Sequence, residues 1–316
     1  MDAIVSSTTS YRTSRSWCTS DPAARIGGLI RLVHPFPILL DALATGAIAT
    51  LGGATPPTAV RLGAAMLALQ ASIGALNDLL DAARDAGRKS GKPIPRGIVG
   101  VGAARGVVIG GLVAGLALAA PSGPATILVA ALGASVGYLY DLRLSQTSWS
   151  WLPFALGVPL LPLFAWLGTT GTVPPALVTL LPIGVVAGAG LALANSLADV
   201  ERDAAAGKPS AAVQLGRDRA WAIQIALLAS AAVLAIALLP VSRAGIPVAS
   251  QALIRAVVII GCVVLLGAAL LVRRADARWR ERAWEIEAIA VAVIGAAWLA
   301  AAAWPDFLEL GLTIGA

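Results

Sequence analysis

Nine long apolar segments constrain the fold of this chain more than any other feature. Each runs for roughly 20 residues, the length that a helix needs to cross the hydrocarbon core of a bilayer. Turn-forming stretches such as GGATPP, PSGP and SRAGIP separate the segments. The predicted spans are residues 28–51, 57–83, 98–119, 123–141, 149–168, 174–198, 218–239, 250–272 and 284–304. The sequence therefore predicts an all-α integral membrane protein, a bundle of nine transmembrane helices.

The composition agrees with this prediction. Hydrophobic residues make up 58% of the chain and charged residues only 13%, whereas a soluble domain is about 25% charged. The two cysteines, Cys18 and Cys262, stand in the polar N-terminal segment and in an apolar run. They predict no disulfide framework.

The distribution of basic residues predicts the orientation in the membrane. Of the 23 Lys and Arg residues, all but Arg61, Arg243 and Arg255 fall on one side. They lie in the N-terminal segment, in the connections after the second, fourth, sixth and eighth spans, or in the span ends next to these. Basic loops stay on the cytoplasmic side, which places the N-terminus in the cytoplasm. The same asymmetry accounts for the net charge of +6 without a nucleic-acid partner. We expect a flexible cytoplasmic tail over 1–24, the helical domain over 25–304 and a short extracytoplasmic tail over 305–316.

Two stretches of the sequence carry the same row of acids. NDLLDAARDAGRKSGKP begins at Asn77 and NSLADVERDAAAGKP begins at Asn195. Both place Asn first, Asp four residues later, Arg at +7 and Asp at +8, with Gly-Lys-Pro following. They fall at the cytoplasmic ends of the second and sixth predicted spans, which run in the same direction. This is the pattern of a parallel internal repeat.

Helical geometry groups the acids of each row. A helix turns about 100° per residue, so the first row covers about 60° of one helix face and the second about 80°. The rows are Asp78, Asp81 and Asp85, and Asn195, Asp199 and Asp203. Such crowded carboxylates at a membrane edge are costly unless they have partners. The structural alternatives are that the acids pair with Arg84 and Arg202 as helix caps, or that they are solvated helix ends.

The functional interpretation of the rows is a metal site. Oxygen ligands without Cys or His nearby favour a hard divalent cation, Mg²⁺, over zinc. Each row would hold about one Mg²⁺, and a diphosphate would bridge the two ions. The predicted catalytic and metal-binding residues are Asn77, Asp78, Asp81, Asp85, Asn195, Asp199 and Asp203. The predicted diphosphate contacts are Arg84, Arg88, Lys89, Lys92, Arg96, Tyr140, Arg143, Arg202 and Lys208.

A metal and diphosphate site at the end of an apolar helical bundle indicates a lipid substrate, an isoprenyl diphosphate. Breaking its C–O bond yields an allylic cation and pyrophosphate, while metals and cationic side chains stabilise the leaving group. Apolar helices would keep water from the cation until an aromatic or other lipophilic acceptor attacks it. We expect a multi-pass cell-membrane enzyme whose site opens toward the cytoplasm.

The chain resembles the UbiA superfamily of intramembrane prenyltransferases. NDLLDAARD matches the family's NDxxDxxxD signature, and DVERD matches its DxxxD signature. GKPIPRG is similar to the family's RPLPxG, with Lys92 where Arg is usual. YLYDLRLSQ is similar to its Tyr-to-Lys segment, with Arg143 in the Lys position. The resemblance covers about residues 25–304 and implies nine helices around a central cavity, two Mg²⁺ ions, and a cap formed by the loops after the second and sixth spans.

Five polar positions carry further predictions. Asp41 lies within the first span, PILLDALAT, and is predicted to contact the acceptor or to hydrogen-bond a neighbouring helix. His34, in HPFP, is predicted to be an interfacial or helix-start residue. Tyr140 either reaches the diphosphate or belongs to the interfacial aromatic belt. Glu285 and Glu287 are predicted to pair with the Arg-rich loop before them.

Two other functions remain open from the sequence. A membrane terpene cyclase would use the same chemistry, with an alkene of the substrate as the nucleophile. A divalent-cation or proton-coupled transporter also combines repeats with membrane acids, although transport acids tend to lie near the midplane. The acceptor and the prenyl chain length are not indicated by the sequence.

Overall fold

The computed structural model describes residues 21–87, 91–240, 247–273 and 275–314, with side chains described as far as residue 303. The described residues form helices joined by turns and loops, with no strands among them. The helices are α2 (Pro22–Leu32), α3 (Pro35–Leu51), α4 (Pro56–Asp85), α5 (Val101–Ala119), α6 (Pro124–Leu139), α7 (Leu152–Thr170), α8 (Pro175–Ala198), α9 (Val200–Ala205), α10 (Ala211–Leu215), α11 (Arg217–Ala237), α12 (Val248–Val272) and α13 (Ala277–Ile314). A 3-10 turn, η2 (Ala120–Ser122), follows α5, and a π-helical turn, η3 (Tyr140–Leu144), follows α6.

Eight helices of the described chain are long and apolar enough to cross a membrane: α4, α5, α6, α7, α8, α11, α12 and α13. The all-α membrane fold is thereby confirmed. The first predicted span is instead a pair, α2 and α3, bent by 64°, and the total reaches nine only if this pair is one span. The count of nine and the cytoplasmic N-terminus stay predictions. α13 continues to Ile314, beyond the predicted end of the last span at residue 304.

The bend between α2 and α3 has a local cause. His34 precedes Pro35, and the ring of a proline disfavours helical geometry in the residue before it. His34 takes a left-handed conformation with φ of 56°. The bend packs against α4 at Gly74, where an added Cβ would lie only 2.9 Å from the Val33 carbonyl oxygen. The absence of a side chain at Gly74 therefore lets the two backbones approach.

Two apolar cores divide the bundle into halves. One core joins α3 to α7 through residues such as Leu62, Leu69 and Phe164, and the other joins α8 to α11, α12 and α13 through residues such as Leu228 and Leu265. A third cluster, which includes Trp166 and Trp298, connects the halves.

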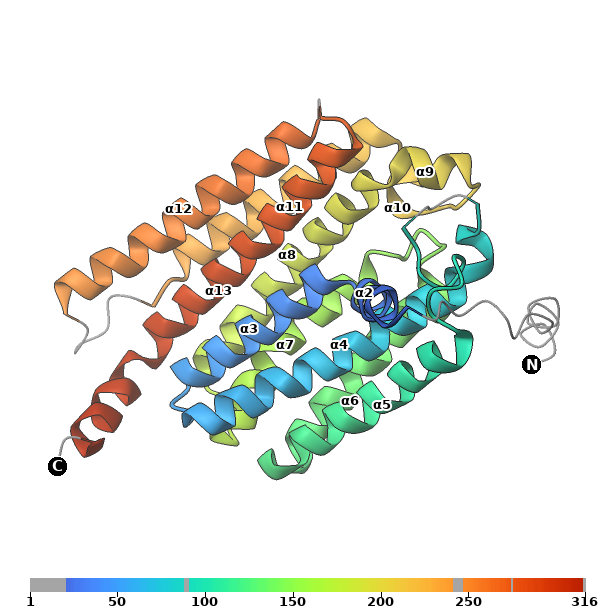
Figure 1. Ribbon diagram of the computed structural model, residues 1–316. Helices are drawn as coiled ribbons and strands as arrows, with labels where there is room; N and C mark the ends of the chain where they lie inside the picture. The colour runs from blue at the N-terminus through green and yellow to red at the C-terminus, as the bar shows by residue number, and fades with distance from the viewer. Residues whose placement is uncertain (1–20, 88–90, 241–246, 274, 315–316) are drawn as a thin grey trace.

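The halves place both acidic motifs at one end of the molecule. α4 and α8 run in the same direction, and α9 and α10 lie at the end of the bundle where α4 finishes (Figure 1). In this view (Figure 1), α2 is seen nearly end-on, so its axis runs at a large angle to those of α3 and α4. The parallel arrangement expected from the repeated motifs is therefore present in the fold.

Candidate active site

The first acidic row lies on the last turns of α4. The helix is continuous to Asp85, so Asp78, Asp81 and Asp85 share one face as predicted. Asp78 is 2% exposed and Asp85 is 5% exposed, whereas the side chain of Asp81 is 21% exposed. The first and last acids of the row are thus buried, and Asp81 between them is more accessible.

One carboxylate oxygen of Asp78 contacts two nitrogen-bearing side chains. His34 Nε2 lies 2.9 Å from Asp78 Oδ1, and the Lys92 ammonium forms an ion pair with the same atom. Asp78 Oδ2 is buried and has no hydrogen-bond partner among the described residues. A buried carboxylate oxygen without a partner is unfavourable, and such a group calls for a ligand or cation to explain it.

The sequence did not assign His34 to the site. His34 was predicted to be an interfacial or helix-start residue, and it does stand at the N-cap of α3, but its side chain turns toward Asp78. The available signal was weak, because the two residues are 44 positions apart. The one clue in the sequence was the His-Pro pair, which interrupts the first apolar span.

The second row departs from the predicted single helix face. α8 ends at Ala198, and Asp199 lies between α8 and α9 with φ of −108° and ψ of 4°. Asn195 is therefore on α8 and Asp203 on α9, although the Asp203 amide still donates to the Asp199 carbonyl at 2.8 Å. The expectation of one continuous helix was wrong here.

A tertiary contact accompanies this break. Glu201, on α9 between the two acids, forms an ion pair with Arg280 of α13, whose side chain is 2% exposed. Arg217 lies 3.5 Å from the other oxygen of Glu201. These contacts hold α9 against the C-terminal half of the bundle. The spacing of residues within one helical segment carries no information about such a contact.

The acids are paired with basic neighbours. Arg84 contacts Asp81 at 2.8 Å, Arg202 contacts Asp199, and Lys208 lies 3.6 Å from Asp203. The capping alternative named Arg84 and Arg202, and both contacts are present. The two Arg–Asp pairs are i,i+3 pairs with part of each side chain in solvent, and such pairs contribute only about 0–1 kcal/mol. They are weak enough for the partners to be exchanged for a metal and a phosphate.

The π-helical turn η3 connects the two rows. On one side, Asp141 Oδ1 accepts a hydrogen bond of 2.9 Å from Asn77 Nδ2. On the other side, Tyr140 lines a pocket with Asn195 and Asp203. Tyr140 therefore lies between the two acidic rows, where it was predicted to reach a diphosphate.

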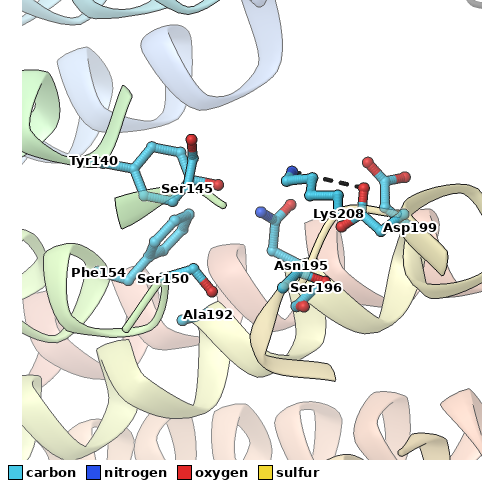
Figure 2. A pocket seen from close by; sticks show the side chains of 11 residues that line it. Tyr140, Ser145, Ser150, Phe154, Ala192, Asn195, Ser196, Asp199 and Lys208 are labelled. Carbon is cyan, nitrogen blue, oxygen red and sulfur yellow. Dashed lines mark ion pairs between the residues drawn. The ribbon is translucent and has the colours of Figure 1, made fainter. Parts of the chain in front are cut away.

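The pocket beside the second row has a volume of about 360 Å³, part of it open to solvent. Figure 2 shows Asn195, Asp199 and Lys208 on one side and the Tyr140 and Phe154 rings on the other. The two rings pack edge to face with centroids 5.9 Å apart. A polar wall thus faces an aromatic wall across the same opening.

The remaining predicted residues lie elsewhere. Arg96 and Arg143 are exposed and do not line the pocket. Arg88 and Lys89 lie outside the described residues. Asp41 accepts a hydrogen bond of 2.5 Å from Gln70 of α4, which is the helix–helix contact named as one of its two alternatives.

The predictions for the C-terminal acids had two outcomes. Glu285 pairs with Arg282 at 2.6 Å, as predicted. Glu287 does not contact the Arg-rich loop. It is fully buried, and both of its oxygens lie 3.0 Å from Gln224 Nε2 on α11. That prediction was wrong, because residue 287 lies on the face of α13 that packs inside the bundle.

The donor set fits Mg²⁺ only with help from a substrate. Among the described residues, no three His, Cys, Asp or Glu side chains are grouped closely enough to hold a metal by themselves. Mg²⁺ commonly binds one or two carboxylates and takes its other ligands from phosphate oxygens and water. The unpartnered Asp78 Oδ2 and the accessible Asp81 and Asp199 are suited to that mode.

Comparison with known proteins matches most of the chain to one protein family. The model of the UbiA prenyltransferase family matches residues 38–287. Chloroplastic chlorophyll synthases of Oryza sativa subsp. japonica and Arabidopsis thaliana are each 32% identical over 157 residues, 46% of this chain. The matched region is 42% and 40% of those relatives, so the similarity spans less than half their length.

Solved structures share the fold. A UbiA homologue from Archaeoglobus fulgidus, bound to GPP and Mg²⁺, is similar with a TM-score of 0.67 and 19% identity, over 85% of this chain and 99% of that one. The apo structure of a UbiA homologue from Aeropyrum pernix K1 gives a TM-score of 0.64 and 20% identity, over 83% and 96% of the chains. At these identities the likeness concerns the arrangement of helices alone.

Proposed function

The chain belongs to the UbiA prenyltransferase family, and from this premise we propose that it is a Mg²⁺-dependent intramembrane prenyltransferase. It would ionise an isoprenyl diphosphate, transfer the prenyl group to a lipophilic acceptor and release pyrophosphate. We further propose that it resides in the cell membrane with the site open to the cytoplasm, as the basic loops predict.

The observation that carries this proposal is the meeting of the two acidic rows around η3. Asn77 contacts Asp141 at the start of the turn, and Tyr140 of the same turn lines the pocket of the second row. Two motifs that are far apart in the chain therefore approach the same turn, which supports their use as one site. A diphosphate carries enough charge to require both, because one carboxylate row with one metal would neutralise only part of it.

Each group of side chains has a role in the proposed reaction. Asp78, Asp81, Asp199 and Asp203 would hold the metal, and Mg²⁺ would neutralise the charge that develops on the leaving diphosphate. Lys208 and Lys92 would exchange their present carboxylate partners for phosphate oxygens. Both lysines are partly exposed, so this exchange requires no unfolding of the bundle.

The aromatic side of the pocket would protect the reactive carbon. Tyr140 and Phe154 form one wall, and Ala192 contributes a small apolar surface below them. An apolar wall excludes water, which would otherwise capture the allylic cation. The face of an aromatic ring also attracts a positive charge. These properties suit the prenyl part of the substrate, beside the acids that suit its head.

The names of the relatives suggest the kind of substrate without choosing one. The curated relatives are chlorophyll synthases, and Archaeoglobus fulgidus structures contain GPP or DMAPP with Mg²⁺. We take from them an isoprenyl diphosphate donor for this chain. The acceptor class stays open.

Asp41 is our candidate for an acceptor contact. It follows His34 by seven residues on α3, and Gln70 precedes Asn77 by seven residues on α4. Two helical turns correspond to about 10 Å. The Asp41–Gln70 pair therefore lies about that far below the first acidic row, within the apolar part of the bundle. A polar pair at this depth is suited to a polar group of an otherwise lipophilic molecule.

Replacing Asp41 by Leu is expected to raise the KM for the acceptor about tenfold, the effect of losing one hydrogen bond to a charged group. The KM for the isoprenyl diphosphate should stay unchanged, because the acidic rows are untouched. Asp41→Asn keeps the oxygen that accepts from Gln70 and serves as the matched control. An unchanged acceptor KM in Asp41→Leu would leave Asp41 as a helix-packing residue only.

The proposed activity can be tested on purified protein in detergent. We expect pyrophosphate release when Mg²⁺, isoprenyl diphosphates of increasing chain length and a panel of lipophilic acceptors are supplied. EDTA should abolish the release and added Mg²⁺ should restore it. Mass spectrometry of the organic product separates transfer from cyclisation, since a cyclase would form a product without any acceptor. Absence of release with every chain length would refute both activities.

The same protein in vesicles tests the transporter alternative. The acids stand at the ends of α4 and α8 rather than near the middle of the helices. We therefore expect no Mg²⁺ or proton uptake into proteoliposomes beyond that of empty vesicles. Uptake that is lost in Asp81→Ala would favour transport over transfer.

A further inference from the structure

Asp141 is a buried acid to which neither the predicted site nor the family comparison assigns a role. It lies in η3, where the Ser145 amide donates to the Tyr140 carbonyl at 2.8 Å. This five-residue step widens the turn, and such π-helical turns are frequent at functional sites. Asp141 is 7% exposed, whereas Leu142 beside it is 52% exposed. Within the turn, Asp141 therefore faces the protein whereas its neighbour Leu142 faces outward.

The two carboxylate oxygens of Asp141 have different surroundings. Oδ1 accepts the 2.9 Å hydrogen bond from Asn77 Nδ2. Oδ2 is buried and lacks a hydrogen-bond partner among the described residues. Its partner Asn77 is the chain neighbour of Asp78 in the first row. A further acid at this position adds like-charge repulsion to the site, so packing alone does not explain it.

The hydrogen bond has a consequence for Asn77. The side-chain amide has a donating end and an accepting end. Because Asp141 engages the nitrogen, the carbonyl oxygen points away from η3. Asn77 and Asp81 are four residues apart on α4 and so lie on the same helix face. The amide oxygen is the side-chain atom of Asn77 that can ligate a metal, and the helix face that carries Asn77 also carries Asp81.

We infer that Asp141 is a positioning residue that orients the Asn77 amide so that its oxygen faces the site for Mg²⁺ and diphosphate. The inference rests on the proposed function, because it presumes that the first acidic row binds that pair. Without Asp141 the amide can rotate and present its NH₂ group, which repels a cation. Groups that hold a metal ligand by hydrogen bonds commonly change metal affinity by about 10- to 100-fold when they are removed.

The second row lacks the same device. Asn195, the counterpart of Asn77 in the repeat, lines the pocket and makes no side-chain hydrogen bond to another described residue. The two rows are therefore related in sequence but not in how their amides are held. Asp141 should affect the first row and leave the second unaffected.

The test measures binding of Mg²⁺, with inorganic pyrophosphate present, to the full chain in detergent by isothermal titration calorimetry. Asp141→Ala is expected to weaken Mg²⁺ binding about 10- to 100-fold. Asp141→Asn should bind close to wild type, because its amide oxygen still accepts from Asn77. Thermal unfolding of each variant shows whether it folds, and Asp141→Asn keeps the test informative if Asp141→Ala does not.

A double-mutant cycle separates positioning from general support of the fold. If Asp141 acts through Asn77, adding Asp141→Ala to Asn77→Ala should weaken Mg²⁺ binding no further. Adding it to Asn195→Ala should weaken binding by the full factor. Additive losses with Asn77→Ala would overturn the inference, as would wild-type binding by Asp141→Ala or an equal loss in Asp141→Asn. Failure of the wild-type protein to bind Mg²⁺ and pyrophosphate would instead count against the proposed function itself.

Discussion

Replacing Asp199 by Asn is expected to lower turnover by on the order of 10²- to 10³-fold, the usual effect of removing one group that stabilises a developing charge. Asn has the same size as Asp but no charge, so it weakens the hold on a metal without opening a cavity. Asp81→Asn should have an effect of the same order, because the proposed diphosphate needs both rows. Pyrophosphate release at saturating substrate is the measurement.

Both substitutions should leave the fold intact. Asp199 and Asp81 each lose one i,i+3 pair with a partly exposed Arg, a contact that contributes about 0–1 kcal/mol. Thermal unfolding in detergent should therefore be nearly unchanged. Asp218→Asn, an exposed acid in the first turn of α11, is the matched control and should keep full activity. Wild-type turnover in either Asp199→Asn or Asp81→Asn would contradict the two-row site.

Replacing Gly188 by Ala is expected to destabilise the protein by about 1–3 kcal/mol, the typical effect of overpacking a close contact. An added Cβ at Gly188 would lie 2.4 Å from the Phe154 carbonyl oxygen and 3.0 Å from the Ala155 Cα. These are backbone atoms of α7, so α7 and α8 must separate to admit the methyl group. Thermal unfolding in detergent measures the loss.

Gly188→Ala should also reduce activity, because it would displace the aromatic wall of the pocket. Phe154 packs against Tyr140, and both rings line the pocket beside the second row. A shift of α7 at Phe154 therefore moves the aromatic wall away from the acids. Gly267→Ala is the matched control, because a Cβ there meets no atom within 4 Å and Ala is the better helix former. Equal stability of Gly188→Ala and Gly267→Ala would show that the α7–α8 contact tolerates a methyl group.

Much of the fold was predictable because its determinants are local. A run of about 20 apolar residues specifies a membrane-spanning helix from its own composition. Where such runs are continuous, as in α4 and α12, prediction and structure differ by a few residues at most. The first span was less predictable. The bend at His34 depends on the left-handed conformation of that residue and on its close approach to α4 at Gly74. A hydropathy profile contains neither feature.

The candidate site was predictable in its residue types and less so in its geometry. The repeated acids identified the ends of α4 and α8 in advance. The break at Asp199 was missed, because the phase of one helix contains no information about the ion pair between Glu201 and Arg280, 79 residues away. His34 and Asp141 were missed for the same reason. Their partners in the first row stand 44 and 64 positions away.

The sequence by itself determined that this chain is a helical membrane protein, that it carries two matched acidic motifs and that it resembles one family. Each of these follows from composition or spacing within a short segment. The tertiary structure alone decided which groups meet. It placed His34 and Lys92 on one oxygen of Asp78, and it put η3 between the two rows. The physical reason is that hydrophobic burial sets where helices run, whereas directional hydrogen bonds between distant segments set how site residues are held.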